Sequence, residues 1–113
     1  MIPAAALAII RAALDDYRLT TPTTAATPAG AADRIVEYLA SSGYTARRPD
    51  ARRPWDRTFP SAAAEEIRAA LTLHTLLIAP HHSTPATAAA RITAELDADD
   101  WHIVPNTRIH NAA

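Results

Sequence analysis

The residues with the clearest capacity for chemistry lie in one arginine-rich segment near the middle of the chain. Five arginines surround a single tryptophan, Trp55; they are Arg47, Arg48, Arg52, Arg53 and Arg57. A guanidinium group binds phosphate in a bidentate manner, and an indole ring stacks on a nucleic-acid base. The segment therefore suggests nucleic-acid or anion binding. The competing interpretation is a solvated loop, because Asp50 and Asp56 balance part of the charge.

Histidines and acidic residues form two further groups that we considered as metal ligands. The histidines are His74, His81 and His82. Adjacent histidines seldom chelate one ion together, and no carboxylate stands at a suitable spacing, so polar loop positions and one semi-buried histidine are the favoured interpretation. The acidic cluster at 97–100 lacks the spacing of a calcium-binding loop. We predict no metal site and no cofactor.

Sequence motifs of known catalytic mechanism are missing. The chain has two glycines, Gly30 and Gly43, too few for a glycine-rich phosphate loop, and it contains neither Gly-x-Ser-x-Gly nor His-Glu-x-x-His. It has no cysteine, which excludes thiol catalysis, disulfide bonds and cysteine-based zinc sites. We predict that the protein is not an enzyme.

The overall composition argues against a strong attraction to nucleic acid or membrane. The formal net charge is −1, and all 11 basic residues are arginine. A chain dominated by Ala, Arg, Pro and Thr is typical of a gene of very high GC content, which suggests a bacterial or phage origin, for instance an actinobacterium or its phage. No apolar run approaches the ~18 residues of a membrane span, and no basic leader precedes the apolar N-terminus. We predict a cytoplasmic protein without membrane contact.

An internal repeat organises the elements that would position these residues. Residues 27–35 nearly recur at 84–92, and the same offset of 57 aligns 2–56 with 59–113 without a gap. Seventeen of the 55 aligned pairs are identical, although seven of these are alanine in a chain with 28 alanines. The other ten fall at apolar helix positions and helix starts, which predicts a tandem duplication. Coincidence between alanine-rich helices is the alternative.

Apolar periodicity predicts four helices in this chain. Apolar residues recur at steps of three and four over the ranges 3–19, 28–41, 60–79 and 85–98. Leu76 and Leu77 widen the apolar face of the third helix, so we expect its end to be buried. Asp15 and Asp16 lie near the unfavourable C-terminal end of the first helix, and we expect them to be solvated.

Two short strands complete the predicted fold. Alternating residues at 44–48 and 101–104 indicate strands that could pair antiparallel. We predict a mainly α (α+β) fold: a duplicated helix-helix-strand unit in a pseudo-two-fold four-helix arrangement with a short two-stranded ribbon. One compact domain spans 1–113. Its parts are repeat one (2–48), an Arg/Pro linker (49–58), repeat two (59–105) and a flexible tail (106–113).

These features predict a small interaction protein that binds a protein partner or itself through a helical surface. The candidate contacts are apolar residues in excess of an alanine-rich core: Leu7, Ile9, Leu73 and Leu77. The alternative is a nucleic-acid-binding regulator that uses the arginine-rich segment, 47–57. A helix-turn-helix is disfavoured, because the predicted loops of about eight residues are longer than its tight turn.

Overall fold

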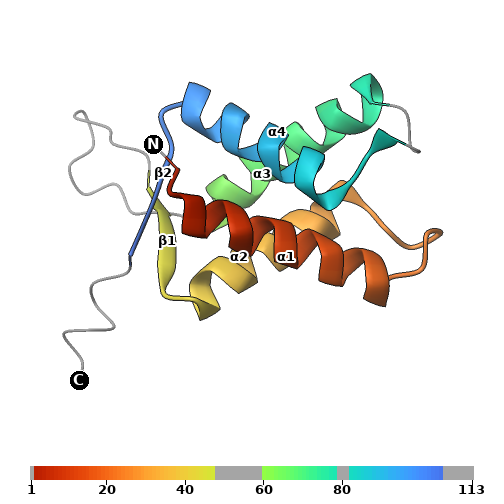
Figure 1. The fold of residues 1–113 in the computed structure, drawn as a ribbon, viewed down its shortest axis with the longest axis horizontal. Helices are drawn as coiled ribbons and strands as arrows, with labels where there is room; N and C mark the ends of the chain where they lie inside the picture. The colour runs from red at the N-terminus through yellow and green to blue at the C-terminus, as the bar shows by residue number, and fades with distance from the viewer. Residues whose placement is uncertain (1, 48–59, 79–81, 106–113) are drawn as a thin grey trace.

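The structure, a computed structural model, describes residues 2–47, 60–78 and 82–105. The element order is helix, helix, strand, helix, helix, strand (Figure 1). The elements are α1 (Ala4–Thr20), α2 (Pro28–Ser41), β1 (Tyr44–Arg47), α3 (Pro60–Leu77), α4 (Pro85–Ala98) and β2 (His102–Pro105). The prediction of a mainly helical fold with a small antiparallel sheet is confirmed. The predicted element bounds differ from the observed ones by at most two residues.

The starts of α2 and α4 follow from a threonine and a proline at the same two positions. Thr27 precedes Pro28, and its hydroxyl accepts a hydrogen bond from the Gly30 amide at 3.0 Å. Thr84 precedes Pro85, and its hydroxyl accepts a hydrogen bond from the Thr87 amide at 3.1 Å. Each threonine satisfies an amide that has no partner inside the helix, and each proline has the φ angle of a first helical turn.

Each of these two helices is followed by a residue with the left-handed backbone conformation. Gly43 has φ +84° and Asp100 has φ +64°, and each is the second residue beyond its helix. The amide of Asp100 donates to the Asp97 carbonyl at 3.1 Å, and that of Trp101 donates to the Leu96 carbonyl at 2.8 Å. This pair of bonds is the Schellman motif, which turns the chain from a helix into the following strand.

Strands β1 and β2 form a two-stranded antiparallel sheet at one end of the helices (Figure 1). The partners are Tyr44 with Pro105, Thr45 with Val104, Ala46 with Ile103 and Arg47 with His102. Position 103 follows position 46 by 57 residues. Adding 57 to residues 45 and 47 gives 102 and 104, so the pairs Thr45–Val104 and Arg47–His102 correspond to each other. The Ala46–Ile103 pair lies between them and corresponds to itself.

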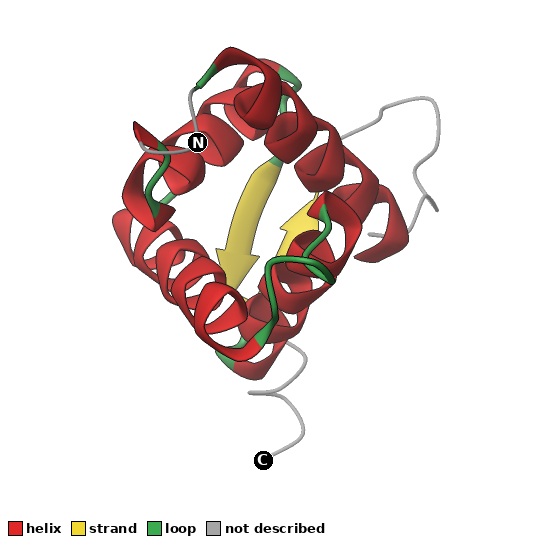
Figure 2. Ribbon diagram, turned by 90° about the vertical axis from the view of Figure 1, so that its right-hand side faces the viewer, coloured by secondary structure: helices red, strands yellow, loops and turns green. Residues whose placement is uncertain are grey.

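The four helices stand at the corners of a square, with the sheet closing one end (Figure 2). α1 packs against α2 and α4, and α3 packs against the same two helices, so α1 and α3 occupy opposite corners. The last turns of α1 and α3 lie at the end away from the sheet (Figure 1).

The core of the described residues has the same spacing of 57. Eighteen apolar residues are buried. Sixteen of them form eight pairs of identical residues 57 positions apart: Ala6/Ala63, Ile10/Ile67, Ala13/Ala70, Leu14/Leu71, Ala31/Ala88, Ala32/Ala89, Ile35/Ile92 and Leu39/Leu96. The remaining two are Trp101 and Ile103, which lie in or beside β2. Alanine at half of the paired positions lets the helices approach closely.

The structure corrects two expectations about helix ends. The end of α3 is not buried, because Leu76 is 78% exposed and Leu77 is 59% exposed. Asp16 is not simply solvated, because it forms an ion pair with Arg34 on α2. In both cases the packing of the neighbouring helix decides which face is covered. The predicted linker (49–58) and tail (106–113) lie outside the described residues.

Candidate interaction surface

The structure places the predicted arginine-rich segment only in part. Arg47 is the last residue of β1 and is exposed. Its other members lie outside the described residues: Arg48, Arg52, Arg53, Trp55 and Arg57. Binding of nucleic acid or an anion by this segment therefore stays a prediction.

The predicted apolar contacts lie on two separate helices. Leu7 is 37% exposed and Ile9 is half-buried, and both lie in the first half of α1. Leu73 and Leu77 lie in the last part of α3. Because α1 and α3 stand at opposite corners of the square, the four residues do not make one surface.

Three leucines near the end of α3 form the most concentrated exposed apolar surface that the structure describes. They are Leu73, Leu76 and Leu77, here called the leucine patch, with exposed fractions of 36%, 78% and 59%. Residues at spacings of three and four lie on one side of a helix, so the three side chains are neighbours. The sequence analysis named two of these contacts and placed Leu76 in the core.

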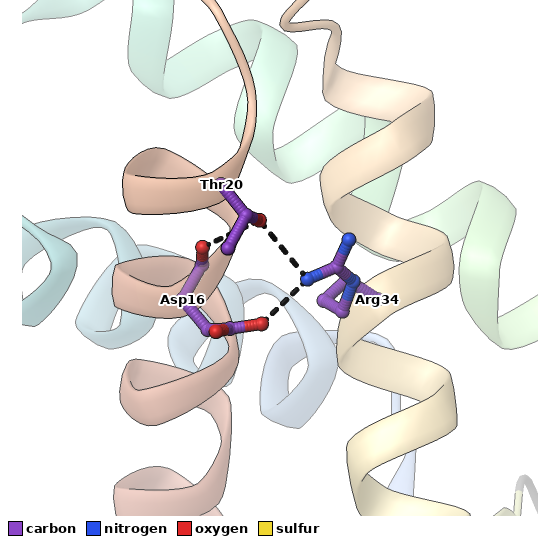
Figure 3. A network of polar contacts seen from close by, with 3 residues as sticks. All are labelled: Asp16, Thr20 and Arg34. Atoms are coloured by element: carbon purple, nitrogen blue, oxygen red, sulfur yellow. Dashed lines mark hydrogen bonds and ion pairs between the residues drawn. The ribbon is translucent and has the colours of Figure 1, made fainter.

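The positions 57 residues earlier show what the same helix face carries in the first half. Asp16 and Thr20 stand where the second half has Leu73 and Leu77, and both contact Arg34 of α2 (Figure 3). The Arg34 Nη1 atom lies 2.5 Å from Asp16 Oδ2 and 3.4 Å from Thr20 Oγ1. The seam between α1 and α2 is therefore polar and internally paired.

Tyrosines complete this polar seam. A hydrogen bond from Tyr38 lowers the pKa of the Asp16 carboxyl, and the Arg34 guanidinium lowers it further. The same hydrogen bond to Asp16 raises the pKa of Tyr38. The Arg34 guanidinium carbon lies 5.6 Å from the centre of the Tyr17 ring, a cation–π distance. This seam was not predicted from the sequence, although an arginine stands at both position 34 and position 91.

The seam between α3 and α4 has different residues at the positions 57 further along the chain. Arg91 stands where α2 has Arg34, but Leu73 offers it no carboxylate and Leu77 offers it no hydroxyl. Glu95 takes the position of Tyr38. The α3–α4 pair thus has an arginine at the position 57 after Arg34, but exposed leucines at the positions 57 after Asp16 and Thr20.

A buried histidine contacts a serine beside this patch. His74 is 4% exposed, and its Nε2 atom lies 3.1 Å from the Ser83 hydroxyl oxygen. A serine nucleophile needs a histidine whose other ring nitrogen is held by an acceptor. His74 Nδ1 is buried and has no hydrogen-bond partner in the part of the chain that the structure describes. Among the residues that the structure describes, no third group of a catalytic triad accompanies this contact.

An open groove of about 730 Å³ separates α1 from the start of α4. It is lined by small side chains and by Arg11 and Asp15 on α1, by Thr84, and by Pro85 and Ala86 at the start of α4. The Thr84 hydroxyl accepts a hydrogen bond from the Thr87 amide, and the Thr87 hydroxyl accepts one from the Thr84 amide. This groove was not predicted from the sequence.

Within residues 2–47, 60–78 and 82–105, no three metal-ligating side chains come together. No helix in these ranges combines the length and the hydropathy that a membrane-spanning segment requires.

Comparisons with known proteins give no relative from which a function could be transferred. Protein-family models, curated proteins and solved structures all lack a significant match to this chain.

Proposed function

We propose that this chain is a non-enzymatic interaction protein whose leucine patch binds an apolar groove on another protein surface, either a partner or a second copy. One observation carries the proposal. The helix face that holds Asp16 and Thr20 in a paired polar seam on α1 holds Leu73 and Leu77 in exposed positions on α3.

The geometry of the patch fits a helix that docks into a groove. Anchors at i, i+3 and i+4 are typical of this mode of recognition, and Leu73, Leu76 and Leu77 have that spacing. A single exposed leucine is common on protein surfaces, but three on one helix face are a concentrated apolar surface. Full burial of one leucine contributes about 1.5–3 kcal/mol, so three suffice as the centre of an interface.

A triple substitution tests the proposal. We expect the variant Leu73→Gln, Leu76→Gln, Leu77→Gln to keep its fold, because exposed substitutions change stability by about 0.5 kcal/mol or less. We expect it to lose association by about 30-fold or more, as for the central residues of an interface. Sedimentation equilibrium over a range of concentrations measures self-association.

A photo-crosslinking amino acid at position 77 tests for a partner other than a second copy, because it attaches covalently to the bound protein in the native cell. The protein captured in this way is then purified, and its binding to the wild-type chain and to the triple variant is measured by titration. The matched control is Leu19→Gln, because Leu19 occupies the position of Leu76 on α1 and is 71% exposed. A wild-type monomer at all concentrations, together with no adduct at position 77 beyond that at position 19, contradicts the proposal.

We further propose that the chain is a tandem duplication of a helix-helix-strand unit, with a pseudo-two-fold axis between the halves. Three observations support it. The bounds of α2 and α4 differ by 57 at both ends. Eight pairs of identical core residues share that offset. The strand register is centred on Ala46 and Ile103, which share it too.

A further inference from the structure

We propose that His74 makes the junction of α3 and α4 an acid-sensitive latch, which holds while the imidazole is neutral and loosens when it takes up a proton. The first half of the molecule has no such device. This inference does not depend on the proposed interaction of the leucine patch.

The contacts of His74 accommodate a neutral ring only. The side chain is 4% exposed, so a charge formed there is largely withdrawn from water. Nε2 contacts the Ser83 hydroxyl at 3.1 Å, and Nδ1 has no partner among the described residues. A protonated imidazole carries N–H groups at both nitrogens. The protonated ring therefore carries a buried charge, and its Nδ1–H group is a buried donor without an acceptor among the described residues.

The charges around His74 oppose its protonation. Burial lowers the pKa of His74 below its ordinary value of 6.5, and the neighbouring Arg91 on α4 lowers it further. The loop before α4 contributes Ser83, which is uncharged, and the exposed His82. Among the described elements, α2, α4 and β1 pack on α3. Their charged residues are Asp33, Arg34 and Glu37 on α2, Arg91, Glu95 and Asp97 on α4, and Arg47 on β1. Of these, Arg34 is paired with Asp16.

The position 57 residues before His74 is occupied by a tyrosine, Tyr17. Its hydroxyl accepts a hydrogen bond from the Thr27 amide at 3.0 Å. Its ring lies beside Arg34, and an aromatic face attracts a cation. A tyrosine gains no charge on acidification. The junction of α1 and α2 therefore lacks the acid-sensitive group that the other junction contains.

A second substitution accompanies the change from tyrosine to histidine. A Cβ atom at Gly30 would overlap the Tyr17 hydroxyl, so the first half needs glycine there. The second half has Thr87 at that position, and its hydroxyl accepts a hydrogen bond from the Thr84 amide at 2.9 Å. Thr87 thus takes over the role of the tyrosine hydroxyl. A tyrosine at position 74 is therefore best introduced together with a glycine at position 87, as in the pair Tyr17 and Gly30.

The linkage between protonation and stability has a definite sign. The unfolded chain binds a proton at His74 more readily than the folded chain does, because the folded pKa is lowered. Stability is unaffected by His74 above about pH 6.5. It falls as the pH drops below that value, by up to about tenfold in the unfolding constant per pH unit, and it levels off below the folded pKa.

The wild type and three variants are compared at pH 7 and pH 5. Urea denaturation measures the unfolding constant of each protein, and amide hydrogen exchange shows which helices lose protection. In the wild type we expect the unfolding constant to rise at pH 5 by up to about 25-fold, the limit set by an unfolded pKa of 6.5, with loss of protection greatest in α3 and α4. In His74→Gln and in the double variant His74→Tyr, Thr87→Gly, we expect this rise to disappear. His82→Gln is the control and retains the wild-type response, because His82 is exposed.

An NMR titration of the wild type keeps the test decisive if a variant does not fold. We expect the His74 ring signals to titrate with a midpoint below pH 6.5, because the pKa of His74 is lowered in the folded chain. A His74 midpoint at or above pH 6.5 overturns the proposal. An unchanged acid response in a folded variant without His74 overturns it as well.

Discussion

Asp100 is the described residue with the least favourable backbone for its type. Its φ of +64° lies in the left-handed region, and the equivalent residue of the first half is Gly43 at φ +84°. An L-residue in this region costs about 1 kcal/mol, although aspartate tolerates it better than most. The Schellman bonds of Trp101 and Asp100 hold the conformation despite this cost.

We expect Asp100→Gly to stabilise the protein by about 0.5 kcal/mol, because glycine adopts positive φ without steric cost. The substitution also removes a contact of 3.7 Å between Asp100 and His102, but Asp100 is exposed and such a pair contributes little. Urea denaturation at pH 7 measures the change.

The reverse substitution at the equivalent site is the control. Gly43→Ala should destabilise by about 1 kcal/mol, although a Cβ at Gly43 meets no atom within 4 Å. If Asp100→Gly destabilised the protein as much as Gly43→Ala does, the left-handed conformation would not be the source of the cost.

At the scale of elements, the two helix pairs use different means to hold the same arrangement. The α1–α2 pair has a polar seam centred on Asp16, Arg34 and Tyr38. The α3–α4 pair has a buried His74 and the leucine patch on its outer side. The two junctions should therefore respond to acid over different pH ranges.

We expect the contribution of Asp16 to stability to be lost in strong acid. Its folded pKa is lowered from 3.8 by Tyr38 and Arg34, so the contribution is present above pH 3.8 and disappears as the pH falls through the folded pKa. Asp16→Asn should be less stable than the wild type at pH 6, and the difference should close toward pH 2. Thermal denaturation over this pH series measures it.

Glu37→Gln is the control, because Glu37 is exposed on the same helix as Arg34. It should show the wild-type dependence on pH. A constant difference between Asp16→Asn and the wild type from pH 6 to pH 2 would mean that packing, not charge, explains the effect of Asp16.

At the scale of the whole molecule, the core contains pairs of identical buried residues 57 positions apart, which allow the proposed pseudo-two-fold axis to be tested. Ile35 and Ile92 are both fully buried, and each lies in the middle of its helix on the side that faces the other helices. In a two-fold arrangement their environments match. In an arrangement without that symmetry they need not.

We expect Ile35→Val and Ile92→Val each to destabilise by about 1 kcal/mol, the usual cost of one buried methylene group. The two values should agree within about 0.5 kcal/mol, and calorimetry measures both. The exposed pair Leu19→Ala and Leu76→Ala should change stability little. A difference of more than about 1 kcal/mol between the isoleucine variants argues against the pseudo-two-fold axis.

The helices, their starts and most of the core were predictable from the sequence. A helix depends on hydrogen bonds within one turn and on apolar residues at steps of three and four, and both are local properties. Thr27-Pro28 and Thr84-Pro85 mark helix starts for the same reason. The buried isoleucines and leucines lie on the predicted faces, including Ile10, Ile67 and Leu96.

The tertiary structure alone decided which outward-facing residues find partners. Asp16 and Leu73 occupy equivalent positions, yet the first meets Arg34 while the second remains 36% exposed. Leu76 and Leu77 extend an apolar stripe in the sequence, but no helix covers them. Periodicity defines a face of a helix, whereas its coverage depends on where the next helix ends. Leu73 and Leu77 were therefore predictable as candidate contacts, whereas the exposure of Leu76 beside them followed only from the placement of the helices.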